Sequence, residues 1–464
     1  MTLLRDTSYP TPGELALAGR ALAEEHPGQV LLRRAGSSRS GRPLWVLSVA
    51  PSEGPDARSS DGTAGPLPPG PARNVLVVAG AHANEPVGGA TALSLARRLV
   101  HDPAPRAGCG WHFLLCADPD GAALHRTPLP DSLLDYHRNF FRPPGPEQPE
   151  WAPSLLPADR LPPETLALTA LIDELRPVLQ VSLHATDLGG SWVQLTRDIP
   201  GLAEPFAESA AELSIPVETG ASDAAGWPSP GPGIYVIPDP GSGAAGAFHP
   251  EDTRLSTWYH AHRYAGTTAI VEVPMWASDL VDDPAPHPDP RGALRVLAGR
   301  LTEDAALVAA VRALTEAAGR PPYPEPDTAP LLRAVDWTLA LIPQIAAEWA
   351  GDGAPAEATA AYIAGIDAFG RRLSLRAAAM LLRVLRTRRH PAAPGLDRLV
   401  TGWCEEFTAR FQARWVPVVT QVEHQSRTVL AAYERLVDPR YGGAGRPAAG
   451  VRPGQDSAGS TGSP

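Results

Sequence analysis

The segment 75–89 places the strongest constraint on how this chain can fold. Its first residues form an apolar, β-branched run that predicts a buried strand, and Ala79-Gly80 then ends it. The following turn presents His82 and Glu85, which are close enough in sequence to converge on one ion. Imidazole nitrogen and carboxylate oxygen both bind zinc at about 2.0–2.2 Å, and a catalytic zinc usually has three protein ligands. The remainder of the chain would then supply a third ligand and a base.

Composition describes a globular protein and excludes several classes of function. The chain has 464 residues, of which 43% are hydrophobic and 20% charged, enough for a substantial core. Its net charge of −11 argues against binding to nucleic acid. It has neither a signal-peptide pattern nor an apolar run long enough to span a membrane. Cys109, Cys116 and Cys404 lack metal-type spacing and fit a reducing compartment, so we expect a cytoplasmic protein.

Short buried strands alternate with helices through roughly the first 320 residues. Strand patterns occur at 30–34, 44–49, 74–78, 111–116, 178–183 and 268–273, and helical patterns at 12–26, 90–100 and 163–175. This alternation predicts an α/β domain with a mixed central sheet and helices on both faces. In such folds, ligands bind at the carboxyl ends of the strands.

The second part of the chain has a different sequence pattern. Long helical patterns cover 329–350, 355–389 and 394–436, and Pro343 should end or kink the first of them. We therefore expect an α/β domain over residues 1–322 with an exposed Pro/Gly-rich loop at 51–73, an all-helical C-terminal extension over 325–438, and a disordered tail over 440–464. Three roles stay open for the extension: covering a cleft, pairing two copies of the chain, or docking a partner.

The third metal ligand and the base are expected at the ends of two further strands. His184 follows an apolar run as His82 does, and strand ends of one sheet can lie close together whatever their separation in sequence. Glu272 is a carboxylate inside an otherwise apolar strand, where it is costly unless it is paired or belongs to a site. It is therefore the candidate base that accepts a proton from a metal-activated water and delivers it to a leaving amine.

Two arginines complete the candidate set. Arg126 follows the Pro119-Asp-Gly121 turn, and Arg138 lies between His137 and an Asn-Phe pair. A guanidinium group can bind a carboxylate through two hydrogen bonds and can stabilise a developing oxyanion. Together these residues indicate metal-assisted hydrolysis of an amide in a substrate that bears a carboxylate.

Over roughly residues 8–320 the chain resembles the zinc carboxypeptidases of the M14 family. The resemblance rests on several motifs in order: Tyr9-Pro-Thr-Pro-Gly-Glu-Leu15, Gly36-Ser-Ser-Arg-Ser-Gly-Arg-Pro-Leu44, His82-x-x-Glu85, Pro119-Asp-Gly121, His184 and the strand of Glu272. Each motif alone is weak, but their common order is specific. The helical extension lies outside the resemblance.

The resemblance implies a role for each matching residue. His82, Glu85 and His184 would bind one zinc ion per chain, and Glu272 would act as general base and acid. Arg126 would polarise the scissile carbonyl, the segment with Arg138 and His137 would hold the terminal carboxylate of the substrate, and Ser256 would lie near the specificity pocket.

The chain departs from the family pattern at three points. Asp118 and His137 each stand where the family has asparagine. The mobile tyrosine of the family has two candidate matches, Tyr235 and Tyr259, and His249 lies nearer the expected position.

The resulting prediction is a zinc metallocarboxypeptidase that hydrolyses the C-terminal amide bond of a small peptide or peptide-like substrate. One alternative is a deacylase of the same superfamily that acts on N-acyl amino acids or peptidoglycan fragments. The other is a zinc-containing binding protein without efficient catalysis, which His137 and the uncertain tyrosine favour. The complete ligand set and Glu272 favour an enzyme.

Overall fold

The computed structural model describes residues 8–52, 73–125, 130–238, 252–317, 328–351, 355–438 and residue 440. Most of the predicted 51–73 loop, the candidate residue Arg126 and nearly all of the predicted 440–464 tail therefore lie outside the described residues.

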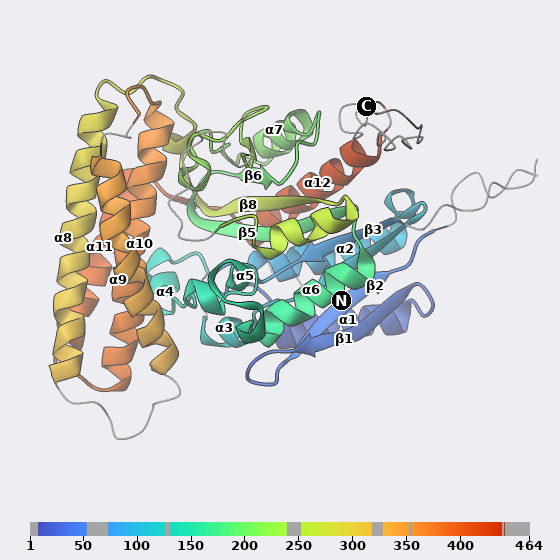
Figure 1. Ribbon diagram of the computed structural model, residues 1–464, viewed down its shortest axis with the longest axis horizontal. Helices are drawn as coiled ribbons and strands as arrows, with labels where there is room; N and C mark the ends of the chain where they lie inside the picture. The colour runs from blue at the N-terminus through green and yellow to red at the C-terminus, as the bar shows by residue number, and fades with distance from the viewer. Residues whose placement is uncertain are drawn as a thin grey trace, which may run out of the picture.

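A mixed sheet of nine strands forms the centre of the α/β domain (Figure 1). The strands are β1 Val30–Ser37, β2 Pro43–Val49, β3 Arg73–Val78, β4 Cys109–Leu114, β5 Leu179–Gly189, β6 Trp192–Leu195, β7 Ile234–Val236, β8 Thr267–Ala277 and β9 Arg414–Trp415. Their order is β1-β2-β4-β3-β5-β8-β6-β7, and β9 pairs with the end of β8. The central strands β4, β3, β5 and β8 are mutually parallel. All the predicted strands are present, whereas β6, β7 and β9 were not predicted because runs of two to four residues carry little periodicity.

Helices cover both faces of the sheet, as the sequence predicts. One face carries α1 Pro12–Glu25, α2 Val87–His101, α7 Ala203–Glu212 and α12 Val418–Val437. The other face carries α6 Pro163–Leu175 and the 3₁₀ helix η6 Thr257–Tyr264. Shorter segments are α3 Pro119–Leu124, α4 Leu133–Arg138, α5 Ala152–Leu155, η2 Ala104–Arg106, η3 Gly145–Glu147, η4 Ala158–Arg160, η5 Ser222–Ala224 and η7 Asp279–Asp282. Because helices cover both faces, β5 is buried along its whole length and β3 along its last four residues.

Four long helices form a bundle beside the sheet, at the left of Figure 1. They are α8 Pro290–Ala317, α9 Ala329–Ala350, α10 Ala360–Thr387 and α11 Ala393–Phe411. Tyr136, Phe140 and Trp276 of the α/β domain share one hydrophobic core with side chains of α10 and α11. The bundle therefore packs directly against the carboxyl ends of β5 and β8.

The packing of the helices corrects the predicted boundary near residue 325. α8, which the sequence prediction assigned to the α/β domain, packs on α9 and α10, whereas α12 packs on α2, α7 and β8. The helical pattern at 394–436 is two helices, because α11 ends at Gln412 in the left-handed region (φ 49°) and β9 returns the chain to the sheet. The bundle is thus an insertion between β8 and the last helix of the sheet layer. Pro343 does not end α9, which continues to Ala350.

No helix among the described residues has both the length and the apolar character needed to cross a membrane.

The turn around Asp118 contains a buried carboxyl with one unmatched oxygen. Asp118 caps α3, and its Oδ1 accepts a hydrogen bond of 2.8 Å from the Gly121 amide. Its Oδ2 is buried and has no hydrogen-bond partner among the described residues. Burial, together with the negative charges of Glu164 and Asp120, raises the pKa of Asp118 to about 7. A Cβ at Gly121 would clash with Asp118 Oδ2 and would lie 2.9 Å from the Ala83 Cβ, so this turn favours glycine.

We expect Asp118→Asn to stabilise the protein more at pH 8.5 than at pH 5.5, by about 1–2 kcal/mol. The pKa of Asp118 is about 7 in the folded protein and about 3.9 in an unfolded chain, so native stability falls as the pH rises between these values. The amide keeps the Oδ1 acceptor and does not ionise. Urea unfolding of both proteins at the two pH values measures the difference, and a pH-independent effect would contradict the prediction.

Candidate active site

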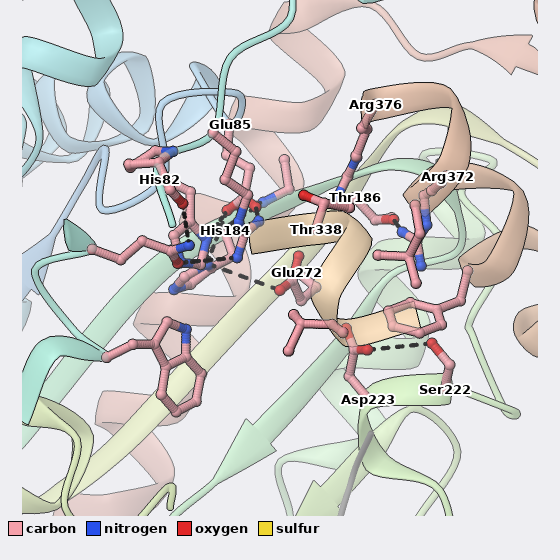
Figure 2. Close-up of a pocket in the computed structure, with 18 of the residues that line it drawn as sticks. His82, Glu85, His184, Thr186, Ser222, Asp223, Glu272, Thr338, Arg372 and Arg376 are labelled. Atoms are coloured by element: carbon pink, nitrogen blue, oxygen red, sulfur yellow. Dashed lines mark hydrogen bonds and ion pairs between the residues drawn. The ribbon is translucent and has the colours of Figure 1, made fainter. Parts of the chain in front are cut away.

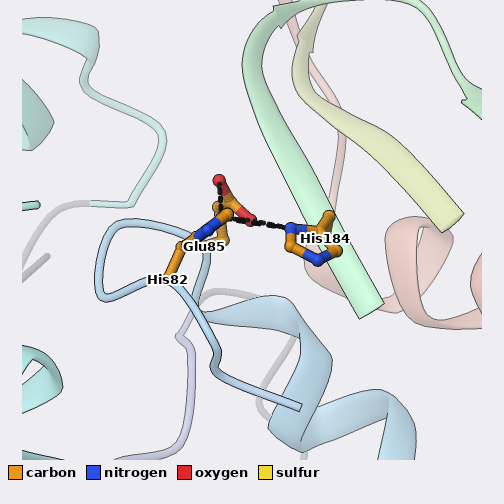
Figure 3. A group of neighbouring side chains, drawn as sticks. All are labelled: His82, Glu85 and His184. Atoms are coloured by element: carbon orange, nitrogen blue, oxygen red, sulfur yellow. Dashed lines mark hydrogen bonds and ion pairs between the residues drawn. The ribbon is translucent and has the colours of Figure 1, made fainter. Parts of the chain in front are cut away.

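His82, Glu85 and His184 lie together, as predicted, although His184 lies inside β5 and not at its end (Figure 3). His82 and Glu85 belong to the turn between β3 and α2, and His184 lies on β5. Because β3 and β5 are adjacent parallel strands, with Val78 beside Ser182, the turn after β3 reaches His184. All three side chains of this metal triad are buried.

The distances within the metal triad fit a zinc ion. His82 Nδ1 lies 3.1 Å from both carboxylate oxygens of Glu85. His184 Nδ1 lies 3.1 Å from His82 Nδ1 and 2.9 Å from Glu85 Oε2. Ligands at about 2.0–2.2 Å in a tetrahedral arrangement are about 3.3–3.6 Å apart, so these atoms already approximate one face of the coordination shell. Two imidazoles and a carboxylate are also a donor set found in catalytic zinc sites.

The electrostatic environment of His184 also favours a cation. Burial lowers the pKa of His184, but the carboxylates of Glu150 and Glu85 outweigh it and hold the pKa well above its ordinary value. Burial would raise the pKa of Glu85, yet His82 and His184 hold it well below its ordinary value. The site therefore stabilises a positive charge at the His184 ring, which either a proton on Nδ1 or a metal ion supplies.

Glu150 is a functional candidate that the sequence analysis missed. Its Oε2 lies 3.1 Å from His184 Nε2, and its Oε1 accepts a 2.6 Å hydrogen bond from Ser182. The side chain is fully buried. A carboxylate that binds the far nitrogen of a metal-ligating histidine fixes the orientation of its ring and the identity of its ligating nitrogen. No local motif marks Glu150, because it comes from the loop before α5.

Glu272 lies beside the metal triad. β5 and β8 are parallel and place Glu272 opposite His184, with Glu272 Oε1 4.0 Å from His184 Nδ1. Its carboxyl faces a cavity that the triad also lines (Figure 2). Burial and the charge of Glu85 raise the pKa of Glu272 to about 8, and a cation in the site would oppose this shift.

The cavity lies between the sheet and the bundle and has a volume of about 170 Å³. The bundle forms one wall, to which α9 contributes Trp337, Thr338 and Ile345 and α10 contributes Phe369, Arg372 and Arg376. A space of this size accommodates a small organic group rather than a folded chain. Of the three roles left open by the sequence, the structure supports that of covering the cleft.

The structure places the predicted carboxylate clamp outside this cavity. Arg138 forms an ion pair of 3.0 Å with Asp397 of α11 and also donates to Thr401. His137 is buried, with Nδ1 at 2.9 Å from the Leu133 carbonyl oxygen. Neither residue is part of the cavity lining. The bundle supplies an acidic partner for Arg138, which the motif itself does not reveal.

The predicted specificity residue also lies elsewhere. Ser256 caps η6, where its Oγ accepts a hydrogen bond from the Trp258 amide, and it does not line the cavity. Tyr235 and Tyr259, the two tyrosine candidates, are likewise not in the lining. Tyr235 donates a 2.9 Å hydrogen bond to the Glu218 carbonyl oxygen.

Arg142 contacts the metal triad but was not predicted. Its Nη1 donates a 2.9 Å hydrogen bond to Glu85 Oε1, and its Nη2 lies 3.1 Å from His82 Nε2. Burial and the charge of Arg142 lower the pKa of His82 to about 4, so His82 is neutral at physiological pH, as a metal ligand must be. Arg142 lies four residues after Arg138, beyond the end of α4, and spacing alone does not distinguish their partners.

Residues 18–189 match the zinc carboxypeptidase (M14) family. The match covers less than half of the chain. The matched range contains the whole metal triad and ends before Glu272. The family is described as zinc carboxypeptidases, and the donor set of the metal triad fits zinc.

Solved carboxypeptidase structures resemble the chain only remotely. A metallo-carboxypeptidase from Burkholderia cenocepacia is 17% identical with a TM-score of 0.37, and the match covers 58% of this chain and 62% of that one. Carboxypeptidase A from Helicoverpa armigera is 16% identical with a TM-score of 0.37, and the match covers 60% and 69%. The chain therefore spans less than two thirds of the Burkholderia protein. No curated protein sequence matches it.

We expect the purified protein to bind about one zinc ion per chain and His184→Ala to lose it. The variant removes one of three protein ligands, which leaves too few donors to hold the ion. Elemental analysis after dialysis measures the metal content. His260→Ala is the matched control, because His260 pairs with Asp173 away from the metal triad and should leave zinc bound. Equal zinc contents in wild type and His184→Ala would contradict the assignment.

Replacement of Glu150 by Gln should weaken zinc binding by about 10- to 100-fold without unfolding the protein. The amide has the same shape but lacks the charge that increases the basicity of His184. Competition with a chelator of known affinity measures the change. An unchanged zinc affinity would show that Glu150 is only a structural partner.

Proposed function

We propose that this protein is a zinc-dependent carboxypeptidase that hydrolyses the C-terminal amide bond of a small peptide or peptide-like substrate. The observation that carries the proposal is the position of Glu272, whose carboxyl lies 4.0 Å from His184 and opens into the same cavity as the metal triad. A titratable group beside a three-ligand site is the arrangement that metal-assisted hydrolysis needs.

Each residue of the site has a role in this proposal. His82, Glu85 and His184 hold the ion, and Glu150 orients His184. When bound, zinc acts as a Lewis acid that polarises the scissile carbonyl and makes water a stronger nucleophile at neutral pH. Glu272 accepts the proton of the attacking water and then transfers it to the leaving nitrogen.

The shape of the cavity supports a small substrate. The wall formed by α9 and α10 leaves a space of about 170 Å³ next to the metal triad. An extended polypeptide needs an open groove, whereas a blocked dipeptide presents only one residue on each side of its amide bond. A cytoplasmic setting remains part of the proposal, on the sequence grounds given above.

The same small cavity favours a second candidate function. A deacylase that cleaves N-acyl amino acids needs room for only one acyl group and one amino acid, and the bond broken is again an amide. Comparison of kcat/KM for blocked dipeptides and N-acyl amino acids with the same C-terminal residue distinguishes the two activities.

We expect Glu272→Gln to lower kcat by about 10²–10⁴-fold while it leaves zinc bound, because the amide cannot accept the proton. Turnover of the preferred substrate and elemental analysis of the same preparation provide the measurement. Near-wild-type turnover would exclude Glu272 as the base. A wild-type protein that binds zinc but turns over neither substrate class would favour the non-catalytic alternative.

A further inference from the structure

Two arginines of the bundle enter the cavity from α10 (Figure 2). Arg372 and Arg376 lie one helical turn apart and so project from the same side of the helix. Arg372 Nη1 donates to Thr186 Oγ1 and lies 3.3 Å from Asp187 Oδ1. Arg376 contacts Asp187 Oδ2 through Nε at 3.2 Å and Nη2 at 3.1 Å.

The charges of this cluster do not balance. Two guanidinium groups share the single buried carboxylate of Asp187, which leaves one positive charge in excess. Arg372 Nε is buried and has no hydrogen-bond partner among the described residues. A buried donor without an acceptor is costly, so the cluster is suited to an additional anion.

The position of the cluster relative to the metal triad matches the length of one amino acid. Thr186 follows His184 by two residues on β5, so both side chains leave the same face of the strand about 7 Å apart. An amino-acid residue spans about 3.3–3.6 Å. A substrate residue could bind the metal through an oxygen at about 2.1 Å and the arginine cluster through a hydrogen bond of about 2.8 Å. Such a residue bridges a gap of this order.

Arg138, which the family resemblance implies as the residue that binds the substrate carboxylate, already forms an ion pair within the protein. Its guanidinium pairs with Asp397, which also forms a 2.9 Å ion pair with Arg386. These contacts direct Arg138 toward α11 and away from the cavity. Arg138 therefore does not line the cavity, whereas Arg372 and Arg376 of α10 do.

We propose that Arg372 and Arg376 form the subsite for the free carboxylate of the substrate, an N-acylated amino acid or a blocked dipeptide. The bundle then recognises the C-terminal end of the substrate in place of Arg138. The choice of substrate class rests on the proposed function, but binding of a carboxylate by α10 does not require hydrolysis. Two-point hydrogen bonds from a guanidinium give such a subsite its preference for a carboxylate over an amide.

The test measures binding without turnover. A panel of N-acetyl amino acids and their C-terminal primary amides is titrated calorimetrically into the zinc-loaded Glu272→Gln protein. We expect the acids to bind at least tenfold more tightly than the corresponding amides. We expect this preference to fall below about twofold in Arg372→Gln and Arg376→Gln.

Two arginine variants serve as matched controls. Arg371→Gln removes a guanidinium from the same helix together with its ion pair to Asp367, and Arg138→Gln removes the clamp that the sequence predicts. Both should keep the preference for the acids. If a glutamine variant does not fold, the lysine variant at the same position replaces it, since it keeps the charge but loses the two-point geometry.

Several outcomes would overturn the proposal. The first is a preference for the acids that survives in both α10 variants. The second is loss of this preference in Arg138→Gln. The third is that no member of the panel binds. Repeating the titration after removal of zinc distinguishes the subsite from direct binding to the ion, because the α10 arginines should still prefer the acids. Failure of hydrolysis with an intact acid preference would overturn the proposed function and leave this subsite in place.

Discussion

β5 pairs in parallel with β3 along one edge and with β8 along the other, and the whole site depends on this pairing. The β3 contact brings the turn with His82 and Glu85 beside His184. The β8 contact sets Glu272 directly opposite His184. A shift of one residue in either register would turn a side chain to the opposite face of the sheet. Backbone pairing therefore sets the geometry of the candidate chemistry, and side-chain contacts then refine it.

Three carboxylates surround the buried His184 ring. Glu85, Glu150 and Glu272 all lie within 4.0 Å of its nitrogens. So much negative charge in a dry site is unfavourable unless a cation compensates it. Arg142 compensates part of this charge through its ion pair with Glu85, and a proton on His184 or a metal ion supplies the rest.

The bundle contributes to the site as well as to the fold. It shares a hydrophobic core with the strand ends, and it places the guanidinium groups of α10 against the buried carboxylate of Asp187. These ion pairs join the bundle to β5 at Asp187, three residues beyond His184. An insertion that packs in this way changes which side chains a substrate meets without altering the metal triad.

The sequence alone determined the elements and the local motifs of the site. Periodicity and apolar runs identified the central strands and the turn that carries His82 and Glu85, because these are short-range properties. The same runs predicted that His184 and Glu272 lie at strand ends, but β5 and β8 continue to Gly189 and Ala277, so both residues lie inside their strands. Tertiary structure decided the partners of the long charged side chains. Arg138 binds Asp397, and Asp187 binds Arg372, through contacts that join residues 259 and 185 positions apart in the chain. A guanidinium can reach many carboxylates, and only the packing of α10 and α11 against the sheet selects among them.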